Sequence, residues 1–148
     1  MKLVESTSPI IRTKTTDVTE ADLPFVQNQL GLMWKVMLDN NGIGLAATQV
    51  GFDKNFFIHN CNETKSMEVV INPTIKSKSQ DKYKFEEGCL SLPGQQFDID
   101  RHTEIVVEYK DIKFNKHEEL MHNYRARVFQ HEIDHLNGIC IDVRKLLG

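Results

Sequence analysis

Apolar side chains recur every three or four residues in two separate parts of the chain. The first stretch runs from Leu23 to Met37, and its spacing predicts an amphipathic helix that ends near the Asn-Asn-Gly at 40–42. The second stretch covers about residues 124–137, with Gly138 placed to terminate it. In this second helix the apolar side chains fall on one side, which predicts its core-facing residues: Phe129, Ile133 and Leu136.

Short runs rich in β-branched and aromatic residues occupy the region between the two helices. They predict strands at 55–59, 67–72, 83–86, 96–100 and 103–110. A lysine- and serine-rich segment at 76–82 is typical of a solvated turn, and 139–143 is expected to form a short strand. One helix, a run of strands and a final helix indicate an α+β fold rather than alternating βαβ units. We therefore expect a single compact domain over residues 1–148, with antiparallel or mixed β-sheets around the second helix.

The composition is that of an ordinary globular chain. It has 148 residues, of which 40% are hydrophobic and 26% charged, and its net charge is −3. This charge gives no electrostatic case for direct binding to nucleic acid. No run approaches the roughly 18 apolar residues of a membrane span, and the segment Met1–Glu5 lacks the apolar core of a secretory signal. We therefore expect a cytoplasmic protein with no membrane association.

The second predicted helix carries the pattern H-E-I-D-H at 131–135. Residues i and i+4 lie on one face of a helix, one turn apart. Two imidazoles placed in this way can ligate one divalent metal, and the glutamate between them can act as general base for a water that the metal activates. Two packed or solvated histidines are the alternative, which the helical context and the helix-ending Gly138 disfavour. A metal hydrolase with this helix at its centre is the first hypothesis.

A catalytic metal usually has three protein ligands and one open position, so a third ligand is required. Ile141 stands where metzincin proteases have their third histidine, and no Glu or His follows His135. The third ligand is therefore expected upstream, among six candidates: Cys61, Cys89, His59, His102, His117 and His122. Cys89 lies in a turn-rich segment, Glu87–Gly94, which suits a ligand projected from a loop. An inert buried cysteine is the alternative for each thiol.

A Gly- and Ala-rich segment at 42–51 follows the first helix. It lacks the G-K-[ST] of a phosphate-binding loop and follows a helix instead of a strand, so that interpretation fails. Small side chains can instead let the backbone of a substrate come close. Gln49 would then offer a side-chain amide able to stabilise an oxyanion. A tight turn packed under the first helix is the alternative.

Three segments together resemble peptide deformylase. Residues 42–49, 87–91 and 130–138 resemble the family patterns G-x-G-L-A-A-x-Q, E-G-C-L-S and Q-H-E-x-D-H-L-x-G, in the same order along nearly the whole chain. The resemblance implies a hydrolase that removes the N-formyl group from the N-terminal methionine of nascent peptides and releases formate. The H-E-x-x-H pattern alone also allows a metallopeptidase acting on internal or N-terminal peptide bonds.

The resemblance also implies a role for each matching residue. Cys89, His131 and His135 would hold one divalent metal, and Glu132 would be the general base. The Gln49 side-chain amide and the Leu90 backbone N–H would form the oxyanion hole. The implied substrate-binding residues are Ile43, Gly44, Gly88 and Val128. The resemblance further pairs Glu87 with Arg101, as an ion pair that braces the Cys89 loop.

The family usually uses Fe(II), and a mixed Cys/His₂ ligand set should also accept Ni, Co or Zn. The resemblance implies formyl-Met nascent peptides as substrates, proximity to the ribosome and a monomer. Two departures from the family pattern stand out. Gln96 occupies a position where many bacterial members have an arginine that contacts the substrate backbone. The chain also ends at Gly148, without the C-terminal helix of many bacterial members; a short form like those carried by some bacteriophages and a truncated chain are the two explanations.

Overall fold

The computed structural model, which describes all residues 1–148, has three α-helices and seven strands. The helices are α1 (Leu23–Asp39), α2 (Asn123–Leu136) and α3 (Ile141–Leu147). The strands are β1 (Gly44–Ala46), β2 (Phe56–His59), β3 (Glu68–Lys78), β4 (Lys82–Cys89), β5 (Leu92–His102), β6 (Glu104–Lys110) and β7 (Lys116–His122). Three short 3-10 turns are η1 (Pro9–Arg12), η2 (Glu20–Asp22) and η3 (Ala47–Val50).

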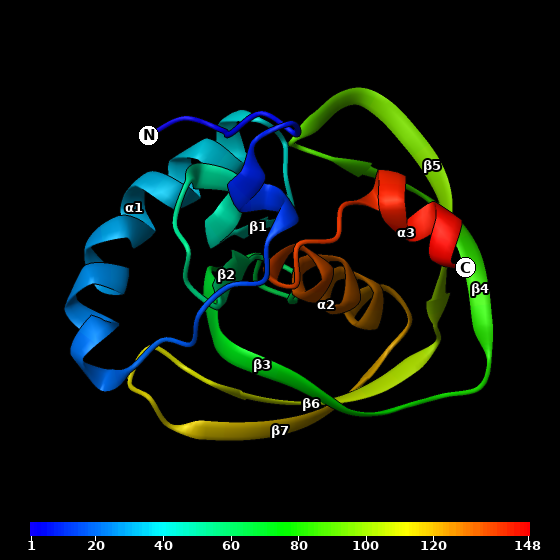
Figure 1. Cartoon of the computed structure of the whole chain (residues 1–148). Helices are drawn as coiled ribbons and strands as arrows, with labels where there is room; N and C mark the ends of the chain where they lie inside the picture. Colours follow the sequence, from blue (N-terminus) through cyan, green and yellow to red (C-terminus); the bar gives the residue numbers. More distant parts are fainter.

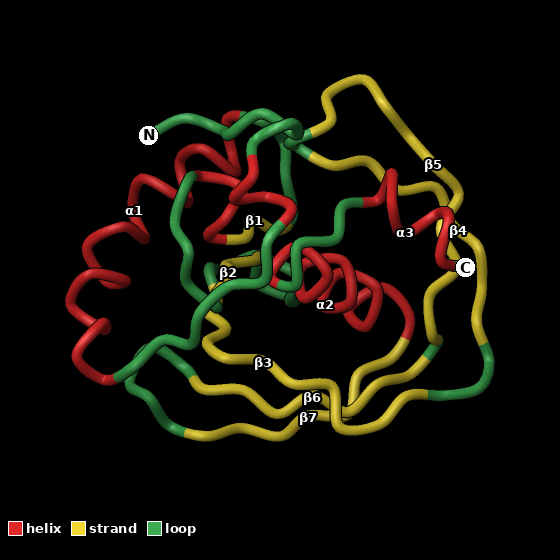
Figure 2. Tube along the Cα trace, in the orientation of Figure 1, coloured by secondary structure: helices red, strands yellow, loops and turns green.

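The strands form two sheets, and every pairing is antiparallel. One sheet has the order β1-β2-β3-β6-β7, and the other is the β4–β5 hairpin. Helix α2 runs through the middle of the molecule, with β3, β6 and β7 along one side and the hairpin on another (Figures 1 and 2). The expected α+β fold with antiparallel sheets around the second helix is confirmed.

Helix α2 is anchored through the apolar face that its sequence predicts. Phe129, Ile133 and Leu136 are buried in a cluster with residues of β2, β3, β6 and β7. The rings of Phe129 and Phe57 meet edge to face, with centroids 5.2 Å apart. Gly138 ends the helix with a φ of +79°, and a Cβ there would lie 2.6 Å from the carbonyl carbon of Arg12. Only glycine fits this position, so the end of α2 is well defined.

Helix α1 positions the segment that follows it. Its buried residues Val26, Leu30, Met33 and Met37 pack on the core side of β2 and β3, as the spacing predicts. The Met37 carbonyl accepts a hydrogen bond of 2.8 Å from the Gly42 N–H, which closes the helix and turns the chain towards β1. Strand β1 then pairs with β2, with Gly44 opposite His59.

Two strands lack the sequence pattern of a strand and were not predicted. Strand β1 has three residues in the segment expected to be a loop. Strand β7 is polar, with Met121 its single buried residue, because it is an edge strand with one face in solvent. An edge strand of this kind gives little hydrophobic alternation to detect.

One expected element type and one expected boundary are wrong. Residues 141–147 form α3 instead of the strand expected at 139–143. Asp142 lies in the first turn of this helix, where a carboxylate is favourable, and Arg12 donates to it at 2.9 Å and 3.1 Å. The turn expected at 76–82 is shorter, because β3 continues to Lys78, which pairs with Ile105 of β6.

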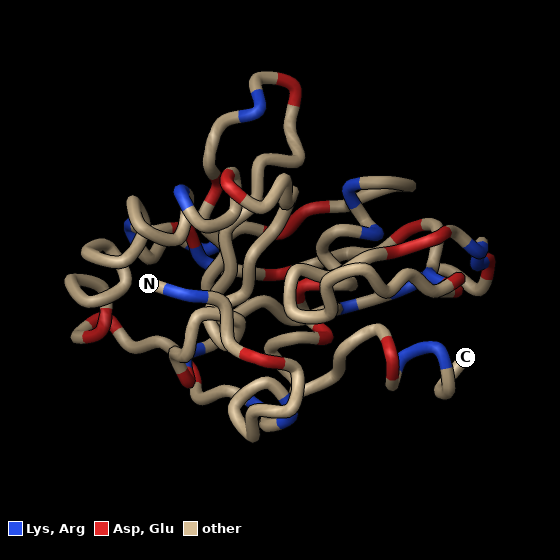
Figure 3. Tube along the Cα trace, turned by 90° about the horizontal axis from the view of Figure 1, so that it is seen from above, with Lys and Arg blue, Asp and Glu red and all other residues tan.

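Charged residues of both signs are distributed over the whole trace, and Figure 3 shows lysines and arginines interspersed with acidic residues. Among the helices, none combines the length and the apolar character needed to cross a bilayer.

His59, at the end of β2, is a fully buried histidine outside the predicted site. Its Nδ1 accepts the Cys61 N–H at 3.0 Å, and its Nε2 has no hydrogen-bond partner. Burial lowers the pKa of His59 from 6.5 to about 4; the Glu68 carboxylate partly opposes this shift, and Arg125 adds to it. The imidazole is therefore neutral in the folded protein at pH 7.

We expect His59 to make the fold sensitive to acid. The unfolded chain takes up a proton on this imidazole near pH 6.5, which the folded protein does not take up until about pH 4. The free energy of unfolding therefore falls as the pH drops from about 6.5 to about 4. Above this range His59 contributes no pH dependence to the free energy of unfolding. The test compares urea titrations of the wild type and His59→Asn, which keeps an acceptor for Cys61. Between pH 7 and about pH 4.5, the free energy of unfolding should fall by about 2 kcal/mol less in the variant than in the wild type. Equal losses would contradict this.

Candidate metal centre and active site

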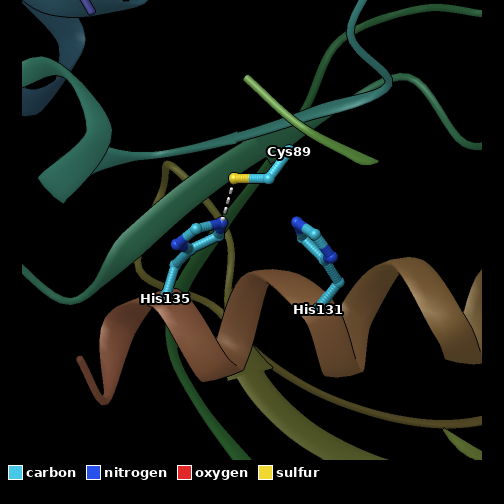
Figure 4. Close-up of side chains that lie close together, drawn as sticks. All are labelled: Cys89, His131 and His135. Carbon is cyan, nitrogen blue, oxygen red and sulfur yellow. Dashed lines mark hydrogen bonds between the residues drawn. The ribbon is translucent and has the colours of Figure 1, made fainter. Parts of the chain in front are cut away.

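Helix α2 brings two histidines to one face. His131 and His135 are one turn apart, and their ring centroids are 4.9 Å apart. Both side chains project from the same side of the helix (Figure 4). Phe129 and Ile133 pack another face of α2 into the core. The helix is therefore fixed in place, and so are the backbone positions from which the two imidazoles project.

Cys89 approaches the histidines from the end of β4. The register of the β4–β5 hairpin shifts between Gly88 and Cys89, and such a bulge re-aims a side chain at the end of a strand. The Cys89 Sγ lies 3.2 Å from His135 Nε2, the contact drawn in Figure 4. The ligand atoms of Cys89, His131 and His135 all lie within 4.8 Å of one another. The structure thus joins one of the six upstream candidates to the two predicted histidines.

The other upstream candidates have partners elsewhere. The Cys61 backbone N–H donates a hydrogen bond to His59. His102 contacts the Ser79 carbonyl, His117 contacts Asp111, and His122 contacts Glu104. Cys140 is buried in the core, with its Sγ 3.9 Å from His135 Nδ1.

The donor set of this cluster fits a divalent cation. His131 Nδ1 lies 2.8 Å from Glu87 Oε1, which orients the ring and leaves Nε2 available as a ligand. Burial disfavours the charged form of His131, yet Cys89 and Glu87 raise its pKa to about 10. Burial and His131 lower the pKa of His135. The two imidazoles thus differ: Cys89 and Glu87 favour a positive charge on His131, whereas His135 is kept neutral. A divalent ion would supply positive charge with both imidazoles neutral.

Glu132 lies beside the cluster as a buried carboxyl group with a spare oxygen. Its Oε1 has no hydrogen-bond partner, and burial raises its pKa to about 7 against the opposing charge of His131. Its Oε2 lies against the backbone of Gly44, where an added Cβ would be 2.5 Å away. The missing side chain at Gly44 therefore leaves the space that this carboxylate occupies. A group with this pKa can both accept and release a proton near neutral pH.

Gln49 is held in one orientation on η3. Its Oε1 accepts the Ala46 N–H at 2.9 Å, and its Nε2 donates to Ser91 Oγ at 3.1 Å and to Cys89 Sγ at 3.6 Å. The amide nitrogen therefore faces the cysteine, and Leu90 follows that cysteine directly in the turn between β4 and β5. Ser91, which fixes the Gln49 amide, was not singled out from the sequence.

A cavity of about 740 Å³ opens beside these groups. It is lined by Ile43 and Gly44 before and in β1, by Gly88 and Cys89 of β4, and by Val128 of α2. Leu90, Gln49, His131, Glu132, Tyr124 and Gln96 also line it. Of the ten site residues expected from the sequence, His135 is the one that does not line the cavity, because it lies behind, with 1% of its surface exposed.

Glu87 and Arg101 form the expected ion pair. Arg101 Nε and Nη2 each donate to the Glu87 carboxylate at 3.0 Å. Burial opposes ionisation of Glu87, but His131 and Arg101 outweigh it and hold the pKa of this carboxyl well below its usual range. The structure adds two residues that sequence reasoning did not assign: Arg127, which also donates to Glu87, and Asp134, which accepts from Arg101 at 2.5 Å.

No local signal predicts the role of Arg127. It lies one turn before His131 on the same face of α2. A buried cation is recognisable from sequence only when its acidic partner is known to be close, and that partner is 40 residues away along the chain.

Known proteins resemble this chain closely. The family model described as polypeptide deformylase matches residues 1–145. The peptide deformylase of Finegoldia magna is 37% identical over 131 residues, which are 88% of this chain and 80% of that protein. The crystal structure of the Thermotoga maritima peptide deformylase superposes with a TM-score of 0.91 at 36% identity, over 97% of this chain and 95% of the other.

A short relative of viral origin is also similar. A probable peptide deformylase from Synechococcus phage S-SSM7 has a TM-score of 0.89 at 33% identity, over 97% of this chain and 99% of that one. None of these matches favours the metallopeptidase alternative. Because one family model matches nearly the whole sequence, and because relatives above 30% identity share the fold, the chain belongs to the polypeptide deformylase family.

Proposed function

We propose that Cys89, His131 and His135 hold one divalent metal, and that the enzyme removes the N-formyl group from the N-terminal methionine of nascent peptides. Membership of the polypeptide deformylase family supports the reaction. The observation that carries the site is the convergence of one thiol and two imidazoles from separate elements, with ligand atoms within 4.8 Å of one another, next to the cavity. Three ligands leave a position open, as hydrolytic metal sites require.

The metal is proposed to be Fe(II), with Ni, Co or Zn able to replace it, because a thiolate and two imidazoles suit all four ions. When bound, the ion would act as a Lewis acid and lower the pKa of water from about 15.7 towards 7.

Glu132 is proposed as the general base. Its pKa of about 7 lets the carboxylate take a proton from the attacking water and return it to the departing amino group of the peptide. The unpartnered Oε1 is the oxygen available for this transfer. Formate and a free N-terminal methionine are the products.

The Gln49 amide and the Leu90 backbone N–H are proposed to stabilise the negative charge that develops on the formyl oxygen. Ala46 holds the Gln49 amide with its nitrogen towards Cys89, so the donor is oriented before the reaction begins. Donors that need no reorganisation contribute most in a site that excludes water.

The peptide is proposed to bind along β1. This strand pairs with β2 on one side only, so the backbone at Ile43 and Gly44 can pair with a substrate strand. Gly88 also lines the cavity and is proposed to contact the peptide, and Val128 with Tyr124 would contact the methionine side chain. Gln96 faces Gly88 across the hairpin and offers an amide for the peptide backbone.

We place the enzyme in the cytosol, close to the ribosome and as a monomer, with residues 1–148 acting as one catalytic domain. The location follows from a substrate that leaves the ribosome with its formyl group in place, whereas the monomer and the single domain are what the resemblance to the family implies.

The first test is formate release from formyl-Met-Ala-Ser by protein loaded with Ni(II), compared with Glu132→Gln. We expect turnover in the wild type and a loss of about 10²–10⁴-fold in the variant, because it removes proton transfer but keeps the shape of the side chain. Metal content by elemental analysis is the control, and it should be unchanged.

Metal loss from Glu132→Gln would make Glu132 a structural residue and overturn its role as base. Cleavage of casein without release of formate would replace the proposed reaction with that of a metallopeptidase.

Gln49→Ala tests the oxyanion hole. The variant should keep its metal and lose about 10²–10³-fold in kcat, because one fixed donor to the developing charge is gone. Steady-state kinetics on the same formyl peptide measure this loss, and wild-type turnover would exclude the role of Gln49.

Exchange of the metal tests its proposed identity. The Fe(II) form should lose activity in air while the Ni(II) form keeps it, because a thiolate on iron is open to oxidation. The rate of inactivation at equal oxygen concentration is the measurement. Equal stability of the two forms would count against a redox-sensitive iron–thiolate pair.

A further inference from the structure

The three proposed metal ligands come from two elements that no backbone hydrogen bond joins. Cys89 ends β4, whereas His131 and His135 lie on α2, and the backbone hydrogen bonds of the β4–β5 hairpin stay within the hairpin. The separation between the thiol and the imidazoles therefore depends on side chains that cross from one element to the other.

Among the side chains that connect α2 to the β4–β5 hairpin, Arg127 makes the most contacts. This side chain leaves α2 with 3% of its surface exposed. Its Nη1 donates to Glu87 Oε2 and, at 3.0 Å, to the Ile99 carbonyl; its Nη2 donates to the Tyr83 carbonyl at 2.6 Å. The guanidinium also lies over the Tyr83 ring, 4.5 Å from its centroid. One side chain of the helix thus holds both strands of the hairpin.

Arg101 makes the reciprocal crossing. It leaves β5, donates twice to Glu87 of β4, and reaches Asp134 of α2 at 2.5 Å. Arg144 donates to the same Asp134 carboxylate at 2.9 Å and 2.7 Å. The two crossings share Glu87, which in turn contacts His131 Nδ1.

We propose that Arg127 is a positioning residue for the metal centre, setting the distance between Cys89 and the two histidines by clamping the hairpin to α2. The inference rests on the proposed metal site. Metal sites require ligand distances within about 0.2 Å of their preferred values, so a small shift of the hairpin is enough to weaken binding. Loss of the guanidinium would remove the donors that Arg127 supplies to the Tyr83 and Ile99 carbonyls and to the buried Glu87 carboxylate, and with them this link between α2 and the hairpin.

The competing explanation is that Arg127 stabilises the fold without regard to the metal. Arg125 separates the two explanations, because it lies two residues earlier on α2 and docks the helix to the other sheet. It donates to Glu119 at 2.6 Å and 2.9 Å and to the Cys61 carbonyl at 2.7 Å, and it lies over the Phe129 ring. Its interactions resemble those of Arg127 in kind, but none of them reaches the hairpin.

The experiment compares Arg127→Met with Arg125→Met in protein loaded with Co(II). Competition with a chelator gives the dissociation constant, the visible absorption of Co(II) reports the ligand geometry, and urea titration gives the free energy of unfolding. We expect Arg127→Met to weaken Co(II) binding about 10–100-fold and to shift the absorption bands. Arg125→Met should lower stability but leave the dissociation constant within about threefold of the wild type.

Arg127→Lys is the second variant, and it decides the question if Arg127→Met does not fold. A lysine keeps a positive charge near Glu87 but cannot span the two carbonyls. It should give a smaller loss of affinity with a detectable shift of the absorption bands.

Wild-type affinity and spectrum in both Arg127 variants would overturn the positioning role, as would an equal loss of affinity in Arg125→Met. Failure of the wild-type protein to bind Co(II) would instead overturn the proposed metal site itself. The two failures are therefore distinguishable.

Discussion

The buried carboxylate of Glu87 is the point on which the site depends. It accepts hydrogen bonds from Arg101 and Arg127 and contacts His131, so one side chain connects β5, α2 and the end of β4. Removal of water from this group is unfavourable, but its donors more than offset that penalty and keep it ionised. Loss of one partner from such a buried pair typically costs about 3–5 kcal/mol, because the remaining charge has no solvent.

Two glutamates with similar burial have opposite properties. Glu87 is surrounded by donors and stays charged, whereas Glu132 has an oxygen without any donor and a pKa near 7. The difference comes from hydrogen-bond partners, since burial alone would raise both pKa values. Pairs of carboxyl groups whose surroundings separate their pKa values in this way divide structural and proton-transfer roles between them.

Local patterns predict α1 and α2, but not α3, whose residues fall in a segment expected to be a strand. They also leave six upstream candidates for the third ligand of the proposed metal site. The spacing of Phe129, Ile133 and Leu136 predicted the buried face of α2, and the turn-rich sequence around Cys89 favoured it as a ligand. The contacts that position these residues cannot be predicted from local patterns, because Arg127 and Glu87 are 40 residues apart in the sequence. A sequence pattern reports the periodicity of one segment, whereas a pairing between segments depends on the fold that both segments share.

The shortness of β1 has a consequence for the behaviour of the protein at high concentration. An open strand edge presents unpaired backbone groups to any other strand, including one from a second molecule. Strand β1 has three residues. A longer open edge would present more unpaired backbone groups and favour aggregation. The strand edge proposed to bind the peptide is therefore short, and a short edge offers few unpaired backbone groups to a strand of another molecule.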